Sequence, residues 1–170
     1  KVLLVDLDLE VVGDMARMLD LNPQKALVDL INLMKRQNIK DFNKNLFLTR
    51  SSFGIDFLAG VVKPQHSPHV APEMIKNALA LWEEDYDYII IDAGKGFSEV
   101  FVSALNQANL ILLVVTPDIL SVYQTKWALD TLQFLHFPLN MVRVILNRAE
   151  SVSKGFCWKT SKDIWWRGLH

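Results

Sequence analysis

The chain is poor in the features that would place it in a membrane or in an oxidising compartment. Its 170 residues include one cysteine, Cys157, which cannot form a disulfide within the chain. No apolar run approaches the roughly 18 residues of a membrane helix, and no signal peptide is visible. These absences predict a cytoplasmic protein without an integral membrane segment.

A marked excess of charge of one sign is also absent. The 18 basic and 19 acidic residues give a net charge of −1, so no general attraction to DNA or to an anionic membrane follows. A composition of 51% hydrophobic and 22% charged residues is globular, and this length suits one domain with a substantial core. The sequence has no methionine at its start and begins inside an apolar run, so we expect it to be a fragment.

Short, mainly apolar runs recur along the chain, at residues 2–5, 88–91, 110–115 and 142–146. Because apolar and polar residues do not alternate in them, they predict parallel strands buried on both faces. Helical periodicity separates these runs, and the expected helices are residues 72–84, 98–108 and 121–135, with a helix, a break and a second helix over 14–33. The pattern predicts an α/β fold, a doubly wound, mostly parallel sheet with helices on both faces.

Two stretches give weaker signals. Residues 46–49 are a weak strand candidate, and residues 51–72 carry several glycines and prolines and are expected to be mainly loop. Residues 156–170 lose periodicity and hold three of the five tryptophans. We expect a domain over residues 1–155, followed by an atypical tail that is frameshifted or foreign.

Carboxylates stand at the ends of two of the predicted strands. Asp6 and Asp8 close the first, and Asp92 closes the run at 88–91. Ligands of open parallel sheets bind at the carboxyl ends of the strands, and Mg²⁺ takes hard oxygen ligands. The spacing of Asp6 and Asp8 puts both side chains on one side if the strand continues. The alternative is an ordinary turn residue at Asp92 and a solvated turn at the Asp6–Asp8 pair.

Candidate binding residues, all polar except Pro117, follow the two later strands as well, at Thr116, Pro117, Asp118, Asn147 and Arg148. An asparagine amide can pair with both a donor and an acceptor of a purine edge, although asparagine also ends many strands without binding anything.

Other chemically capable residues have simpler explanations. His66 and His69 have no acidic or cysteine partner at metal-ligand spacing, and Cys157 has no histidine motif beside it. Trp165 and Trp166 are not supported as a membrane anchor by any amphipathic helix.

In combination, the motifs resemble the MinD/ParA superfamily of deviant-Walker P-loop ATPases, and within it most closely the CpaE/TadZ branch of pilus-assembly and localisation proteins. The resemblance covers residues 2 to about 154. It rests on VLLVDLDLE at the start, YDYIIID at residues 86–92, VVTPD at 114–118 and LNR at 146–148. These segments are similar to the switch I strand, the Walker B strand, the following strand with its helix start, and the adenine-side strand end.

The resemblance implies roles for individual residues and two cofactors, ATP and Mg²⁺. Asp8 would orient the attacking water, Asp6 would lie near magnesium, and Asp92 would hold magnesium through water. Residues 93–96 would form switch II, so Gly94 is counted with the nucleotide-binding residues. Asn147 would read the adenine, and Arg148, Pro117 and Asp118 are assigned to the nucleotide site with it.

The family also implies an ATP-dependent homodimer, partners from a pilus or secretion apparatus, and recruitment to a cell pole or an inner-membrane assembly. One departure is clear: the glycine-rich phosphate loop and its lysines, with the first strand of this fold, do not occur in these 170 residues. We therefore expect this chain alone to be inactive, and its parent protein to be an ATPase. The alternatives are a non-hydrolysing scaffold and a chromosome or plasmid partition ATPase, although the near-neutral charge gives no strong signal for nucleic acid.

Overall fold

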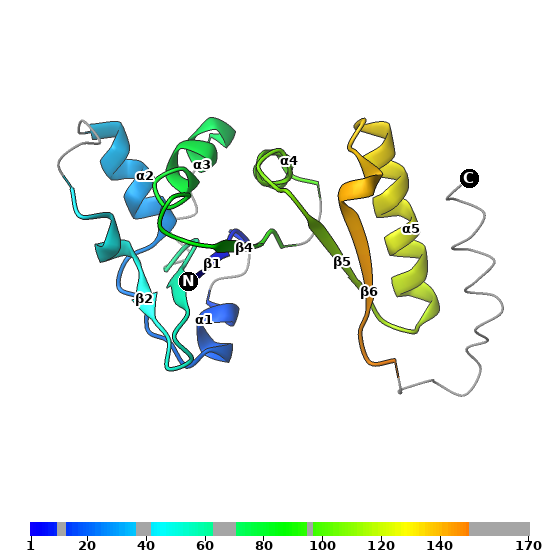
Figure 1. Cartoon of the computed structure of the whole chain (residues 1–170), viewed down its shortest axis with the longest axis horizontal. Coiled ribbons are helices and arrows are strands. Elements are labelled where there is room, and N and C mark those ends of the chain that lie inside the picture. Colours follow the sequence, from blue (N-terminus) through cyan, green and yellow to red (C-terminus); the bar gives the residue numbers. More distant parts are fainter. Residues whose placement is uncertain (10–12, 37–41, 63–70, 95–96, 150–170) are drawn as a thin grey trace. The chain divides into compact units, whose positions relative to one another are not determined.

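The computed structural model describes residues 1–9, 13–36, 42–62, 71–94 and 97–149. The chain divides into two compact units, Lys1–Gln107 and Ala108–His170, each of which combines strands with helices (Figure 1). The tail at 156–170, with Cys157, and the histidines His66 and His69 lie outside the described residues. The boundary expected at residue 155 therefore stays a prediction.

The first unit is built on a four-stranded sheet in the order β2-β3-β1-β4. The strands are β1 (Val2–Asp6), β2 (Thr49–Arg50), β3 (Asp56–Leu58) and β4 (Tyr88–Asp92). The central strand β1 is parallel to both β3 and β4, and only the β2–β3 hairpin is antiparallel. The mostly parallel sheet expected from the apolar runs is confirmed.

Helices cover both faces of this sheet. The helices are α1 (Asp14–Met18), α2 (Leu27–Arg36), α3 (Pro72–Leu79) and α4 (Glu99–Leu105). Side chains of α2, α3 and α4 share one core cluster with Leu3 and Val5 of β1. Leu4 points to the opposite face, where it packs against the cluster that contains Ala16 of α1. Period-two alternation along β1 thus explains the two layers of helices.

The second unit pairs β5 (Ile111–Val115) with β6 (Val142–Leu146) in parallel. The helix α5 (Ile119–Phe134) connects them, and the 3₁₀ helix η4 (Leu139–Met141) leads into β6. Val122, Thr125 and Leu132 are the buried residues of α5. A helix between two parallel strands is the connection that this pairing requires.

Several local expectations need correction. The strand expected at residues 46–49 is wrong for its first half, because Leu46 and Phe47 belong to the 3₁₀ helix η2 (Lys44–Phe47), and only Thr49 lies in a strand, β2. Asn43 caps η2 by accepting a hydrogen bond from the Asn45 N–H. The stretch expected to be mainly loop contains β3. Ser98 is the N-cap of α4 as expected, with its hydroxyl oxygen 3.1 Å from the Phe101 nitrogen.

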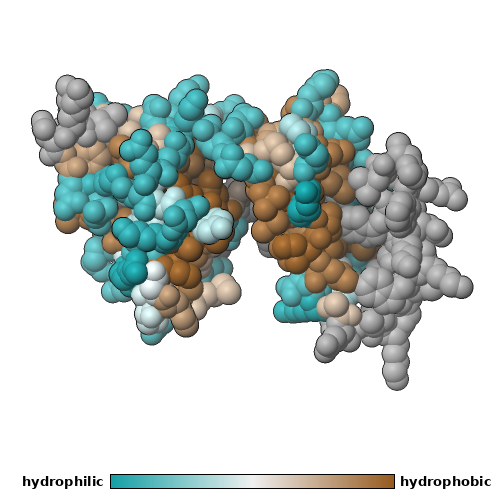
Figure 2. Space-filling view, in the orientation of Figure 1, coloured by the Kyte–Doolittle hydropathy of each residue, from teal (hydrophilic) through white to brown (hydrophobic). Residues whose placement is uncertain are grey.

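The expectation that the strands are buried on both faces is wrong for β4, β5 and β6. Tyr88 and Ile90 of β4 are 69% and 53% exposed, and Leu112 and Val114 of β5 are 52% and 62% exposed. Figure 2 shows apolar side chains gathered on the visible face of the unit formed by β5, β6 and α5. The apolar runs have the composition of buried strands, but no described residues cover these side chains within either unit.

Candidate functional site

A cluster of carboxylates lies at the carboxyl ends of β1 and β4. Asp6 and Asp92 are direct partners in the register of the two parallel strands. The ladder is extended by one further hydrogen bond, in which the Leu7 N–H donates to the Asp92 carbonyl oxygen at 2.8 Å. The shared edge predicted from the sequence is therefore formed for these two residues.

Asp8 joins this edge by a turn rather than by strand alternation. The side chains of Asp6 and Asp8 would lie on one face of the strand only if β1 continued to Asp8, but β1 ends at Asp6. Instead, the backbone N–H of Asp8 donates to Oδ1 of Asp6 at 3.0 Å. This short-range bond folds the chain back beside Asp6, as aspartate side chains commonly do at turns.

Asp6 is the most buried carboxylate of the cluster, with 6% of its surface exposed. Burial raises the pKa of Asp6 from its ordinary value of 3.8 to about 6, against the opposing effect of the Asp8 N–H. The neighbouring carboxylates of Asp92, Asp8 and Asp14 raise this pKa further. A buried group with a strongly shifted pKa among like charges is typical of functional sites, because a bound cation would relieve the repulsion.

The donor set suits magnesium held through water. Within the described ranges, no three His, Cys, Asp or Glu side chains are grouped so as to hold a metal ion directly. Mg²⁺ usually keeps several of its waters and takes only one or two carboxylates from the protein. Asp6 and Asp92 supply carboxylate oxygens from one rung of the sheet, so their chemistry fits a water-mediated site.

Two glycines bring backbone close to these carboxylates. The Gly94 N–H donates to Oδ1 of Asp92 at 3.1 Å, and Gly94 has a positive φ of 69°. Gly60, in the segment after β3, approaches so closely that a Cβ there would lie 2.4 Å from the Asp6 carbonyl oxygen. Gly60 was missed by the sequence reasoning, since only the close approach of two distant segments identifies it.

The residues predicted for the adenine side lie in the second unit, at the ends of β5 and β6. Asp118 is the N-cap of α5, accepting from the Ser121 N–H at 2.9 Å and from the Thr116 hydroxyl at 2.5 Å. The Thr116 hydroxyl, followed by that backbone bond, lowers the pKa of Asp118. Asp118 therefore has a structural role at the start of α5, and Pro117 beside it is buried.

Asn147 is fixed at the end of β6 by its backbone N–H, which donates to the Val115 carbonyl oxygen at 2.8 Å. Its side-chain oxygen accepts from the Arg148 N–H at 2.9 Å, and Arg148 has a left-handed backbone with φ 54°. The side-chain NH₂ of Asn147 takes no part in that bond. The structure thus groups the four predicted residues of each unit at strand ends: Asp6, Asp8, Asp92 and Gly94 in the first, and Pro117, Asp118, Asn147 and Arg148 in the second.

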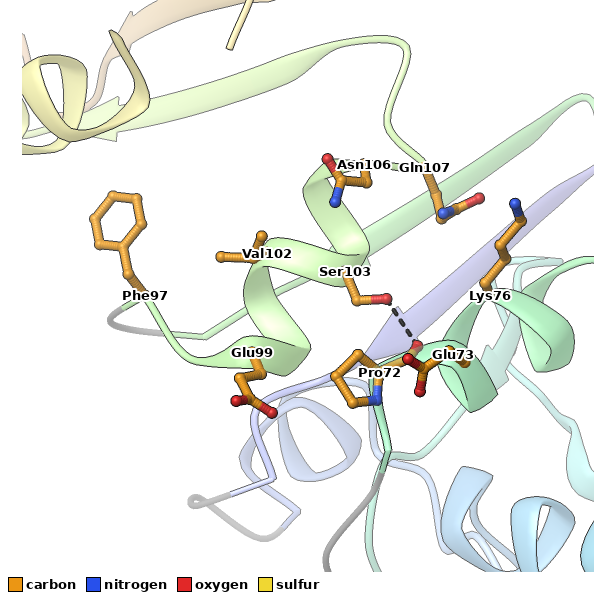
Figure 3. Close-up of a pocket in the computed structure, with 9 residues that line it drawn as sticks. All are labelled: Pro72, Glu73, Lys76, Phe97, Glu99, Val102, Ser103, Asn106 and Gln107. Atoms are coloured by element: carbon orange, nitrogen blue, oxygen red, sulfur yellow. Dashed lines mark hydrogen bonds between the residues drawn. The ribbon is translucent and has the colours of Figure 1, made fainter. Parts of the chain in front are cut away.

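A separate hollow of about 430 Å³ lies between α3 and α4 (Figure 3). The Ser103 hydroxyl donates to the Pro72 carbonyl oxygen at 2.8 Å and ties the two helices together beside it. None of the residues predicted for the nucleotide site lines this hollow.

Comparisons with known proteins agree with this architecture. A ParA family ATPase from Chlorobium tepidum superposes with a TM-score of 0.75 at 20% identity, covering 96% of this chain and 66% of that protein. MinD of Pyrococcus horikoshii, solved with Mg-ADP, gives a TM-score of 0.74 at 22% identity, covering 96% of this chain and 64% of that protein. The chain therefore has the α/β fold of the MinD/ParA P-loop ATPases.

A match in sequence points the same way. The septum site-determining protein MinD of Bacillus subtilis is 38% identical over 53 residues, which is 31% of this chain and 20% of that protein. No family model matches the chain. The chain thus aligns with about a fifth of this relative and about two thirds of the solved structures.

Proposed function

We propose that the chain is part of an ATP-binding and ATP-hydrolysing protein of the MinD/ParA type. The observation that carries this proposal is the pairing of Asp6 with Asp92 on one rung of the β1–β4 ladder, with Asp8 turned beside them. The same fold in the Pyrococcus protein was solved with Mg-ADP. Carboxylates at the ends of parallel strands are where this class of fold positions magnesium and water.

Each residue has a distinct proposed role. Asp92, with Asp6 beside it, holds Mg²⁺ through water, and Asp8 orients the water that attacks the terminal phosphate. When bound there, Mg²⁺ would supply positive charge that neutralises the charge developing on the phosphate oxygens. Asn147 reads the adenine, with Arg148, Pro117 and Asp118 around the base and Gly94 on the phosphate side.

We further propose that a phosphate-binding loop and its strand belong to the same protein but lie outside these 170 residues. The exposed edge of β4 supports this proposal. Among the described residues, β4 pairs only with β1, so no described strand lies along its other edge. An apolar strand of a parallel sheet is normally covered on its free edge.

The cellular role proposed is the positioning or assembly of a pilus or secretion apparatus through ATP-dependent dimerisation, in the cytoplasm with recruitment to a pole or membrane assembly. Among the described residues, no helix has the length and apolarity needed to cross a membrane. The near-neutral net charge of −1 favours this role over partition along DNA.

Calorimetry with Mg-ATP tests the nucleotide proposal. The protein as the cell makes it should bind Mg-ATP, whereas residues 1–170 alone should bind poorly, because phosphate cradles depend on backbone N–H groups of a glycine-rich loop. Micromolar affinity in residues 1–170 would show that the phosphate contacts lie within them. Binding without hydrolysis in the cellular form would favour the scaffold alternative, and light scattering with and without a non-hydrolysable ATP analogue tests the dimer.

A further inference from the structure

The loops that follow β1 and β4 meet at an unusually close contact between Asp8 and Gly94. A Cβ on Gly94 would lie 2.8 Å from Cγ, 2.9 Å from Cβ and 3.0 Å from Oδ2 of Asp8. Carbon atoms that are not bonded to one another prefer separations of about 3.5–4.0 Å. Any side chain at position 94 would therefore compete with Asp8 for the same space.

Hydrogen bonds hold the backbone of both Gly94 and Asp8 in place. The N–H of Gly94 is bonded to the side chain of Asp92, and the N–H of Asp8 is bonded to the side chain of Asp6. Asp6 and Asp92 are themselves register partners in adjacent strands. Each loop is thus anchored to the end of its own strand, and the strands are fixed side by side.

We propose that Gly94 is a positioning residue that sets the place of the Asp8 side chain, because the absence of a side chain at position 94 leaves the space that Asp8 occupies. The steric coupling stands on the contact alone, and its consequence for ATP hydrolysis rests on the role proposed above for Asp8. The position of the Asp8 side chain therefore depends on the position of the Gly94 backbone.

The chain provides two matched controls. Gly13 and Gly54 have φ of 80° and 79°, close to the 69° of Gly94. Among the described residues, a Cβ on Gly13 would meet nothing within 4 Å, and one on Gly54 would meet a terminal nitrogen of Arg50 at 3.6 Å and no other atom. Alanine at these positions adds the strain of a left-handed backbone without the clash, so the clash at Gly94 can be separated from the strain.

Urea unfolding of the protein as the cell makes it measures the coupling. Gly94→Ala should lower the folding equilibrium constant at least about tenfold more than Gly13→Ala or Gly54→Ala does, since overpacking adds to backbone strain. In an Asp8→Gly background the excess should disappear. In an Asp8→Ala background part of it should persist, because the Cβ of Asp8 remains.

Comparing Gly94→Ala in the wild-type and Asp8→Gly backgrounds tests the steric contact even if Gly94→Ala alone is too unstable to fold. If Gly94→Ala does not fold alone but folds in the Asp8→Gly background, that rescue supports the contact. An equal loss in the wild-type and Asp8→Gly backgrounds, or a double variant that does not fold, would overturn it.

Steady-state kinetics of the protein as the cell makes it test the positioning role. Gly94→Ala should lower kcat for ATP by at least about tenfold, and adding it to Asp8→Ala should lower kcat no further. A rise in KM with kcat unchanged would overturn the positioning role. Absence of hydrolysis in the wild-type protein would overturn the proposed function. The urea unfolding of the single and double variants would still test the contact between Gly94 and Asp8.

Discussion

Asp6 and Asp92 occupy one rung of the parallel ladder between β1 and β4, so two carboxylates of like charge stand side by side at the edge of a sheet. Burial of Asp6 makes this arrangement unfavourable for folding, as its raised pKa shows. Residues that destabilise the fold where they stand are characteristic of sites selected for binding or catalysis.

Replacing Asp6 with asparagine should stabilise the chain at neutral pH. Because the pKa of Asp6 in the folded state is about 6, against an ordinary 3.8, the folded protein binds more protons between those values. The stability linked to protonated Asp6 is fully present below its ordinary pKa of 3.8 and is lost as the pH rises through its folded-state pKa of about 6. Asp6→Asn should therefore raise the free energy of unfolding at pH 7 by about 2 kcal/mol.

Urea unfolding in EDTA at a series of pH values measures this effect. The difference between the wild type and Asp6→Asn should shrink toward zero near pH 4, about where the ordinary aspartate pKa lies. A difference that did not change with pH would contradict the raised pKa.

Gly60→Ala should destabilise the chain by about 2 kcal/mol or more, because overpacking against backbone cannot be relieved by a rotamer change. The added Cβ would lie 2.4 Å from the Asp6 carbonyl oxygen and 3.1 Å from Cδ2 of Leu9. Chemical denaturation measures the loss, with Gly13→Ala as the control, since a Cβ at that position meets no atom of the described residues within 4 Å. A smaller loss for Gly60→Ala than for Gly13→Ala would show that the segment after β3 is farther from β1.

Tyr86→Phe should weaken the first unit by about 1.5–3 kcal/mol at pH 7, the usual range for a hydrogen bond to a charged group. The Tyr86 hydroxyl donates to Oδ2 of Asp56 at 2.7 Å, and Arg50 donates to Oδ1 at 2.8 Å. Burial acts to raise the pKa of Asp56, but the hydrogen bonds from Arg50 and Tyr86 outweigh it and lower that pKa.

The sign of the pH effect at Asp56 is opposite to that at Asp6. Stability from Asp56 is present above its ordinary pKa and is lost as the pH falls through the lowered value. The penalty of Tyr86→Phe should accordingly diminish in acid. Tyr88→Phe, at a side chain that is 69% exposed, is the control and should change the urea midpoint little.

Trp82→Phe should be tolerated better than its complete burial suggests. Trp82 is 0% exposed, and its Nε1 has no hydrogen-bond partner among the described residues. Phenylalanine loses volume but also removes a buried donor that is unsatisfied, whereas Trp82→Ala should lose about 3–5 kcal/mol. Equal losses for the two variants in thermal or urea unfolding would show that the indole N–H has a partner.

The apolar runs identified β1, β4, β5 and β6 because strands of parallel sheets are usually continuous apolar runs, whereas strands with one solvent-facing side alternate apolar and polar residues. The convergence of Asp6 and Asp92 followed from the same reasoning, since the carboxyl ends of parallel strands share an edge. The three-residue strand β3 could not be found in this way, because its pairing with β1 is a tertiary interaction. The fit of Gly94 against Asp8 likewise depends on two loops far apart in sequence.

Single-turnover hydrolysis by the Asp8→Ala variant of the protein as the cell makes it tests most directly whether Asp8 acts on the water that attacks ATP. Loss of a residue that acts only in the transition state lowers the chemical rate and leaves ground-state binding intact. We expect a fall in the hydrolysis rate of at least about a hundredfold, with Mg-ATP affinity essentially unchanged. Hydrolysis at the wild-type rate would contradict the account.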